Sequence, residues 1–271
     1  MAAIRTKDNL NSEEQPMNPN TFFVLGAPDP EAREIARVCQ ERSIPHGFAT
    51  VPGGNIVHSH EAYQATGVTA LIPRGADIVF VECTVLGLVP DARIDHHHEG
   101  DPGFGKPPSE YLQGSSLGQF LAYIGVEPTQ QQRVIAAADH CLMSAYQGCC
   151  PGISPEELAA FRLESRSRAR GLTPEELTRQ IDEATSLLQS AERITLAGEQ
   201  VAFIMEPPNE VGEASARLGV PYVYVRRQDA QQFKAGIRSA PHHLVQAWLS
   251  DCGLARCYGD PARGFAGGYF A

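Results

Sequence analysis

The sequence predicts an α/β fold in which a doubly wound, mainly parallel sheet is joined by helices to a smaller α/β C-terminal domain. Residues 21–26 and 78–81 are short apolar runs typical of strands that are buried on both faces. A helical pattern over residues 30–39 lies between them, which gives the β-α-β order of a parallel sheet. Strand-like runs return at residues 200–205 and 221–226, and these predict the second domain.

The composition is that of a globular protein with an acidic balance. Hydrophobic residues make up 42% of the 271 residues, and the formal net charge is −10. This charge disfavours a long nucleic acid as partner, because surfaces that bind one are basic. The seven cysteines form no C-x-x-C pair, which disfavours a zinc ribbon. The sequence shows neither a secretory signal nor an apolar run of membrane-spanning length, so we expect a cytoplasmic protein that has no membrane partner.

The N-terminal segments predict the first β-α-β unit. Residues 1–20 are polar and predict a disordered tail. The strand at residues 21–26 leads to a helix that begins at Pro30, with Asp29 at the N-cap position. Asp29 can therefore be a cap alone or a ligand as well. A second strand is predicted over residues 45–51.

Two helix starts predict how the domains are divided. Ser154 and Thr173 each place a hydroxyl before a proline and two acids, which is an N-cap signature. The two helices predict a helical connector over residues 153–190. The first domain is then expected at residues 21–152 and the C-terminal domain at residues 191–271.

Acids and histidines follow several of the apolar runs. Glu82 ends the strand-like run before it, residues 95–98 read Asp-His-His-His, and Asp139 follows an apolar run at residues 134–138. Ligands of open α/β sheets bind beyond the carboxyl ends of the strands, so we expect Asp29, Glu82 and residues 95–98 to share a site. Imidazoles together with carboxylates favour a divalent metal ion. A solvated polar loop is the alternative for residues 95–98.

Two other segments have the composition of anion sites. Ser115 and Ser116 precede a predicted helix, and hydroxyls with N–H groups at a helix start can bind an anion. An ordinary N-cap is the alternative. Near the C-terminus, glycines follow Arg263, and such a turn can hold an anion with its N–H groups while the guanidinium binds it bidentately. A flexible glycine-rich tail is the alternative there. The glycines concerned are Gly264, Gly267 and Gly268.

The order and spacing of these motifs resemble the DHH phosphoesterase superfamily. This group includes RecJ-like exonucleases, nanoRNases, cyclic dinucleotide phosphodiesterases and manganese-dependent inorganic pyrophosphatases. The name motif is met by Asp95-His96-His97, and the later motifs are matched by Glu82, Glu110 with residues 114–116, Asp139 and the closing glycine-rich run. The first motif of the family, Asp-x-Asp, resembles Asp29-Pro30-Glu31.

The resemblance implies a role for each matching residue. The implied metal ligands are Asp29, Glu31, Glu82, His96 and Asp139. Asp95 would orient His96, and His97 and His98 would donate to a phosphate oxygen. The implied substrate-binding residues are Ser115, Ser116, Arg263, Gly264, Gly267 and Gly268. The metal would be two Mn²⁺ ions, with Mg²⁺ or Co²⁺ as alternatives.

These roles predict a metal-dependent phosphoesterase that hydrolyses a phosphodiester or phosphoanhydride in a small nucleotide or short oligonucleotide. Leu25 stands where the family has a histidine, and Glu31 and Glu82 replace aspartates. These departures keep open an alternative, a degenerate DHH-type module that binds a nucleotide without hydrolysing it. A structural or interaction protein is a third hypothesis, and a homodimer stays open.

Overall fold

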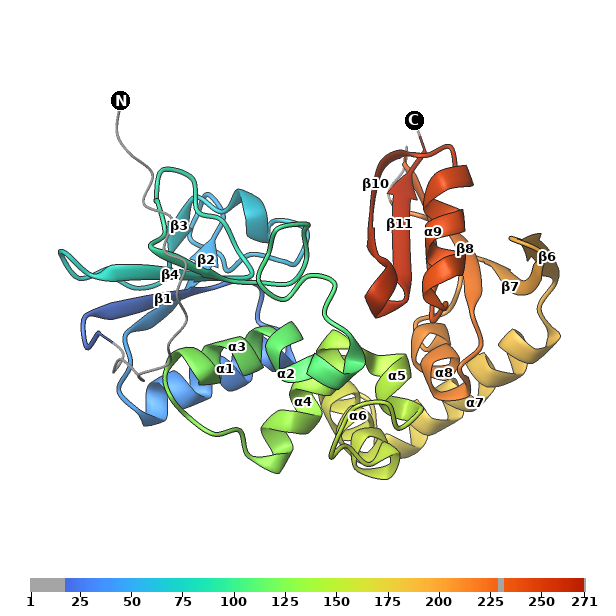
Figure 1. Ribbon diagram of the computed structural model, residues 1–271, viewed down its shortest axis with the longest axis horizontal. Helices are drawn as coiled ribbons and strands as arrows, with labels where there is room; N and C mark the ends of the chain where they lie inside the picture. Colours follow the sequence, from blue (N-terminus) through green and yellow to red (C-terminus); the bar gives the residue numbers. More distant parts are fainter. Residues whose placement is uncertain (1–17, 229–231, 271) are drawn as a thin grey trace.

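The computed structural model describes residues 18–228 and 232–270, which form two sheets with helices beneath and between them (Figure 1). The predicted tail lies outside the described residues up to residue 17. Its last residues form a turn against the first sheet, where the side-chain amide of Asn18 donates to Asp77 at 2.6 Å.

The first sheet is mainly parallel, as expected. Its strand order is β3-β2-β1-β4-β5, and all neighbours are parallel except the edge pair β2–β3. The strands are β1 (Thr21–Leu25), β2 (His46–Thr50), β3 (Gly67–Val68), β4 (Asp77–Val81) and β5 (Ala92–Ile94).

Both faces of this sheet are covered, which explains why its central strands are apolar without interruption. Phe23 and Leu25 of β1 pack with the helices, whereas Phe22 and Val24 pack under residues 51–76, which contain the short helix η1 (Ala62–Gln64). The helices on the first face are α1 (Pro30–Glu41), α3 (Ser116–Tyr123) and α4 (Gln130–His140). Three shorter helices flank them, η2 (Pro108–Glu110), α2 (Tyr111–Gly114) and α5 (Leu142–Tyr146).

Two longer helices run from the first half of the molecule to the second (Figure 1). They are α6 (Pro155–Arg170) and α7 (Pro174–Ser190), and the predicted caps are confirmed. The hydroxyl of Ser154 accepts from two N–H groups of α6, and Thr173 forms a capping box with Glu176. The domain boundaries stay a prediction.

The second sheet has the order β10-β11-β9-β8-β7-β6, and β7–β8 is its one parallel pair among the described strands. Its strands are β6 (Arg193–Leu196), β7 (Glu199–Met205), β8 (Tyr222–Arg227), β9 (Phe233–Arg238), β10 (Ala255–Asp260) and β11 (Phe265–Tyr269). Helices α8 (Val211–Leu218), α9 (His242–Asp251) and η3 (Pro261–Arg263) complete this half.

The helices of this half leave part of the second sheet open. Helix α9 covers one face, while α7 and α8 cover β7 and β8 on the other. On that other face, no helix in the described part of the chain packs on β9, β11 or β10, and these strands turn toward the first sheet (Figure 1). The predicted α/β class, with a mainly parallel sheet and a smaller α/β part after the helices, is therefore confirmed. None of the described helices has both the length and the apolar character that crossing a membrane requires.

Candidate functional site

Four titratable side chains meet at the carboxyl edge of the first sheet. Glu31, Glu82, His96 and Asp139 each offer one ligand atom, and these atoms all lie within 4.8 Å of one another. We call these four residues the acidic cluster. Glu31 lies in the first turn of α1, Glu82 directly after β4, His96 after β5 and Asp139 in the last turn of α4. The apolar run before Asp139 is thus part of a helix, while Glu82 follows a strand as expected.

Glu82 is held by an unusual backbone conformation and by one hydroxyl. Its φ is 50°, in the left-handed region that non-glycine residues rarely adopt, which is a mark of functional positions. Gly26 leaves the space that this conformation of Glu82 requires, because a Cβ at residue 26 would collide with the Glu82 carbonyl oxygen. The hydroxyl of Ser116 donates to Glu82 Oε1 at 2.7 Å.

His96 is fully buried and points Nε2 at the acids. Its Nδ1 donates to the Gly114 carbonyl oxygen at 2.8 Å, which directs Nε2 into the cluster. Nε2 lies 3.2 Å from Asp139 Oδ2 and 3.3 Å from Glu82 Oε1. The expectation that Asp95 orients this ring was wrong, because the Gly114 carbonyl does so.

Asp95 instead orients His97. One of its oxygens lies 3.0 Å from Nδ1 of His97, and Tyr63 donates its hydroxyl to the carboxylate at 3.0 Å. Burial raises the pKa of Asp95, but the contacts to His97 outweigh it and lower the pKa below its usual value. The fixed Nδ1 leaves Nε2 of His97 free for a ligand, since His97 lines the cavity described below.

The acidic cluster contains buried polar atoms that have no hydrogen-bond partner. They are Glu31 Oε2, His96 Nε2 and Asp139 Oδ2, of which the last two lie 3.2 Å apart and form an ion pair only when His96 is protonated. Such atoms are rare in folded proteins because each costs the free energy of its lost hydration. A cation contacting all three would satisfy them, and three carboxylates with one imidazole suit a divalent metal ion. The residues therefore fit a divalent cation.

The pKa shifts in the cluster show how closely its charged groups lie. Burial and the charges of Asp139, Glu82 and Asp29 raise the pKa of Glu31 well above its usual value. Burial and Arg263 lower the pKa of His96, but the carboxylates of Asp139 and Glu82 outweigh them and raise it to about 9. Without a cation, protons therefore compensate the crowded negative charge.

Asp29 stands beside the cluster and outside the group of four. Its Oδ1 caps α1 by accepting from the Ala32 N–H at 2.8 Å. Burial, and then the charges of Glu82 and Asp139, raise the pKa of Asp29 to about 7. The predicted cap is confirmed, whereas a ligand role for Asp29 stays a prediction. His97, Glu82 and His96 form a second group that could hold a metal ion.

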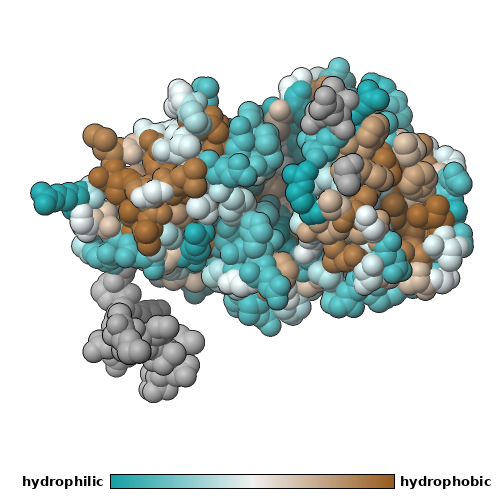
Figure 2. All heavy atoms as spheres, turned by 90° about the horizontal axis from the view of Figure 1, so that it is seen from above, coloured by the Kyte–Doolittle hydropathy of each residue, from teal (hydrophilic) through white to brown (hydrophobic). Residues whose placement is uncertain are grey.

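A cavity of about 560 Å³ opens beside the cluster, between the two halves of the molecule. Asp139 and His97 line it from the first half, and Lys234, Arg238 and Tyr258 line it from the second sheet. Figure 2 shows the groove between the halves, bordered by hydrophilic atoms. The cavity has the size of a small-molecule site, for which about 300–1,000 Å³ is typical.

Arg263 crosses this groove and binds backbone carbonyls and the carboxylate of Asp139, 3.7 Å from its Nη2, rather than facing an open anion site. Its Nε donates to the carbonyl of His140 at 3.0 Å, and its Nη2 to that of Asp139 at 3.1 Å. These are carbonyls of the last turn of α4, which lack partners within the helix. The guanidinium thus caps the helix, as the favourable interaction with its dipole predicts.

The glycines after Arg263 differ in what they do. Gly264 lines the cavity, with φ of 75°. Gly267 and Gly268 belong to strand β11, where added Cβ atoms would lie 2.7 Å from the Tyr258 hydroxyl and 3.0 Å from Cys257 Sγ. The predicted anion-binding turn is therefore a β-hairpin, and these two glycines allow β10 and β11 side chains to pack.

Three other expected site residues lie away from open space or away from the cluster. Ser115 and Ser116 are fully buried, and Ser115 is the N-cap of α3, the alternative kept open above. Neither serine can reach a ligand in the cavity. His98 is exposed and stacks edge-on against Tyr63, with ring centroids 4.5 Å apart. Tyr63 was missed, because nothing near it in sequence reveals its contact with Asp95.

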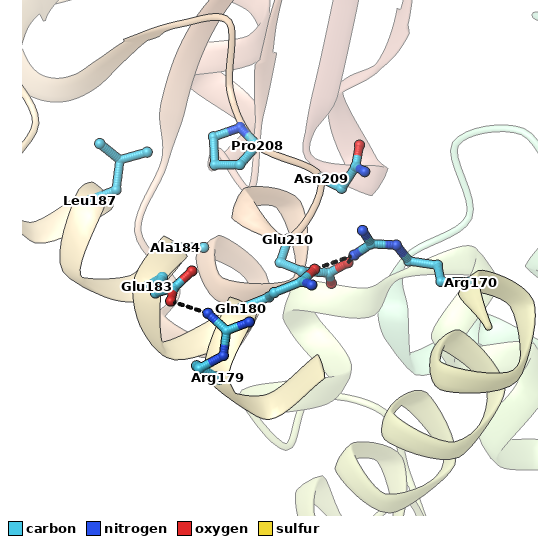
Figure 3. Close-up of a pocket in the computed structure, with 9 residues that line it drawn as sticks. All are labelled: Arg170, Arg179, Gln180, Glu183, Ala184, Leu187, Pro208, Asn209 and Glu210. Atoms are coloured by element: carbon cyan, nitrogen blue, oxygen red, sulfur yellow. Dashed lines mark hydrogen bonds and ion pairs between the residues drawn. The ribbon is translucent and has the colours of Figure 1, made fainter. Parts of the chain in front are cut away.

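A second cavity, of about 590 Å³, lies between α7 and the loop that precedes α8 (Figure 3). Its charged groups already compensate one another. Arg170 pairs with Glu210 and Gln180, and Arg179 pairs with Glu183. The groove beside the acidic cluster is therefore the better candidate for a functional site.

No protein-family model and no curated protein matches this chain. Among solved structures, the chain is similar to the pGpG-specific phosphodiesterase PggH from Vibrio cholerae, with 10% sequence identity and a TM-score of 0.35. The match covers 93% of each chain. A likeness at this level establishes neither the family nor the activity, so the functional conclusion rests on the site itself.

Proposed function

We propose that the protein is a divergent DHH-type phosphoesterase, which uses a divalent cation at the acidic cluster to hydrolyse a phosphodiester or phosphoanhydride in a small nucleotide. The observation that carries the proposal is the convergence of three orphaned buried atoms, on Glu31, His96 and Asp139, beside a cavity of ligand size. The proposed ion is Mn²⁺, which accepts mixed carboxylate and imidazole ligands.

The acidic cluster supplies the proposed ligands of the cation. Glu31, Glu82, His96 and Asp139 would hold the cation. When bound, the metal supplies positive charge that polarises a phosphoryl oxygen and lowers the pKa of water. The Gly114 carbonyl keeps His96 Nε2 pointed at the carboxylates.

His97 is the proposed proton carrier of the site. Asp95 holds its Nδ1, so the ring presents Nε2 to the cavity, where it can donate to a phosphate oxygen or to the leaving group. Tyr63, which donates to Asp95, acts as a positioning residue behind this pair. His98 points away from the cluster and has no role in the proposal.

The test replaces His96 by alanine. Hydrolysis of bis(p-nitrophenyl) phosphate with Mn²⁺ should fall at least 100-fold, because the site loses its imidazole ligand. His243→Ala is the matched control, since this exposed histidine pairs with Glu199 in the second sheet. Mn²⁺ binding should be measured in parallel by calorimetry.

Each result of this experiment is decisive. Undiminished turnover in His96→Ala would remove His96 from the reaction and contradict the proposal. Wild-type protein that binds Mn²⁺ and a nucleotide but hydrolyses no phosphoester would instead support the degenerate nucleotide-binding module.

A further inference from the structure

We propose that Cys141 and Cys150 are a site of reversible oxidation, at which the two thiols form a disulfide that secures helix α5 in its contact with the second half of the molecule. The proposal is independent of the proposed function, because it concerns neither the cation nor the substrate. It follows from the position of the two sulfur atoms and from the contacts of the helix between them.

The two thiols face each other in the interior of the protein. Their Sγ atoms lie 2.9 Å apart, although the residues are nine positions apart in sequence. Cys141 is 3% exposed and Cys150 is 2% exposed. A disulfide joins its sulfur atoms at about 2.05 Å. Forming the bond therefore needs only a small approach of the two sulfur atoms.

Hydrogen bonds hold the backbone beside each cysteine. The carbonyl of Cys141 accepts from the Ala145 N–H at 2.9 Å, which ties it to the start of α5. After the helix, the Cys149 N–H donates to the Ser144 carbonyl at 2.8 Å, and the chain turns back so that Cys150 meets Cys141. The fold thus brings the two thiols together before any bond forms between them.

The other cysteines differ in their surroundings. Cys39 and Cys83 pack in separate apolar clusters of the first half. Cys252 and Cys257 lie with their Sγ atoms 3.4 Å apart, but Cys257 is exposed. Cys149 is exposed as well, although it precedes Cys150 directly in sequence. A bond at the buried pair would be shielded from solvent, and the exposed neighbour supplies a matched control.

Helix α5 lies between the two cysteines and connects the halves of the molecule, next to α8 (Figure 1). Tyr146, at the end of α5, donates its hydroxyl to Glu213 of α8. Leu142 and Met143, at its start, line the cavity beside the acidic cluster. A disulfide closes the chain around this helix and restricts the unfolded chain, so it should oppose unfolding of the segment that carries these contacts.

The oxidant of the proposed step is a peroxide. The hydrogen bond with Cys141 lowers the pKa of Cys150, and this outweighs the raising effect of burial. The Cys150 thiolate, which is the reactive form, attacks one peroxide oxygen. The O–O bond breaks, Cys150 becomes a sulfenic acid, and the released hydroxide takes up the thiol proton as water.

The second thiol completes the disulfide. Cys141 attacks the sulfenic sulfur, the S–O bond breaks, and the oxygen leaves as a second water with the Cys141 proton. The two sulfur atoms together lose two electrons, which the peroxide accepts. Hydrogen peroxide is small and neutral, and the residues on either side of Cys141, His140 and Leu142, line the cavity. Solvent therefore comes within one residue of the pair.

The test maps the cysteines of the full-length protein after treatment with hydrogen peroxide. Free thiols are alkylated in denaturant, and trypsin then releases residues 134–162 as one peptide with three cysteines, Cys141, Cys149 and Cys150. After oxidation this peptide should carry one alkyl group instead of three, and dithiothreitol should restore all three. A further cut by chymotrypsin after Tyr146 should leave the fragment with Cys141 joined to the fragment with Cys150.

Cys149→Ser is the matched control. This variant should still form the bond, because the exposed thiol takes no part in it. Oxidation should raise the urea midpoint of the wild type and of Cys149→Ser equally, and by more than in Cys141→Ser. The last variant keeps Cys252 and Cys257, so it accounts for any bond between those two. Cys150→Ser takes its place if Cys141→Ser shows no cooperative unfolding.

Three results would overturn the proposal. A wild-type peptide that keeps three alkyl groups after the treatment would show that no bond forms. Fragments that separate after the cut at Tyr146, or loss of the bond in Cys149→Ser, would assign the bond to Cys149. Equal midpoints of the oxidised and reduced wild type would show that the bond does not stabilise the protein.

Discussion

Replacing Ser116 by alanine should weaken divalent cation binding, whereas the same change at Ser115 should not. The two serines are neighbours in sequence and both are fully buried. Ser116 donates to Glu82 Oε1 at 2.7 Å, while the Ser115 hydroxyl accepts from the Gly118 N–H at 3.0 Å and caps α3. Comparing the two variants therefore distinguishes a serine that positions a proposed metal ligand from a serine that caps a helix.

The size of the effect follows from these contacts. Loss of a group that orients a metal ligand costs about 10–100-fold in affinity, which is about 1.4–2.7 kcal/mol. Loss of an N-cap leaves a helix N–H without its partner and costs about 0.5–2 kcal/mol of unfolding free energy. Ser116→Ala should therefore change the Mn²⁺ dissociation constant, and Ser115→Ala the stability of the metal-free protein.

Chemical unfolding at fixed Mn²⁺ measures both quantities without any assumption about activity. At a concentration 100 times the wild-type dissociation constant, the ion should add about 2.7 kcal/mol to the free energy of unfolding. With a dissociation constant raised 10–100-fold, the gain in Ser116→Ala should be between about 1.4 and 0.4 kcal/mol. Ser115→Ala should have a lower free energy of unfolding without Mn²⁺, but Mn²⁺ should raise that free energy by as much as it does in the wild type.

Two results would refute this reasoning. A Ser116→Ala protein with the wild-type gain would show that Glu82 needs no support from the hydroxyl or is no ligand. An equal loss in Ser115→Ala would show that the effect passes through helix α3 rather than through the contact with Glu82.

Two other predictions concern stability. Burial raises the pKa of Glu213, but its contacts with Arg162, Tyr146 and Arg217 outweigh this effect and lower the pKa below the ordinary 4.5. The ionised carboxylate therefore stabilises the folded protein above pH 4.5. This stabilisation is lost as the pH falls through the lowered pKa. Glu213→Gln should lower the free energy of unfolding by about 3–5 kcal/mol at pH 7. In urea unfolding measured from pH 7 to 3, the variant should also lose less stability on acidification than the wild type does. An unchanged loss would show that other groups cause the acid sensitivity. Gly26→Ala should lower the unfolding free energy by about 1–3 kcal/mol and weaken Mn²⁺ binding, because the new methyl group meets the Glu82 carbonyl; wild-type stability and affinity together would contradict this.

Features encoded by neighbouring residues could be predicted from the sequence. The cap of α1 by Asp29 and the capping residues Ser154 and Thr173 are local patterns, and all three are confirmed. The strands at the sheet centre were also predicted, because burial on both faces requires unbroken apolar runs. The acids that follow these segments could be singled out, since a sheet edge brings them together.

Features that depend on distant contacts could not be predicted. Tyr63 holds Asp95 from 32 residues away, and Arg263 reaches the carbonyl of His140 from 123 residues away. The sequence predicts a ligand-binding turn at Gly267 and Gly268, because the composition of a glycine-rich turn is the same as that of a strand whose neighbours need space. Only the register with β10 distinguishes these two uses of glycine.

The contact of Arg263 with the end of α4 has a consequence for biosynthesis. The carbonyl of Asp139 leaves the ribosome 124 residues ahead of the guanidinium that binds it. At a synthesis rate of about 5–20 residues per second, this delay is roughly 6–25 s. For that interval the nascent chain must present the last turn of α4 to water, and the two halves close over it only after the C-terminal hairpin has emerged.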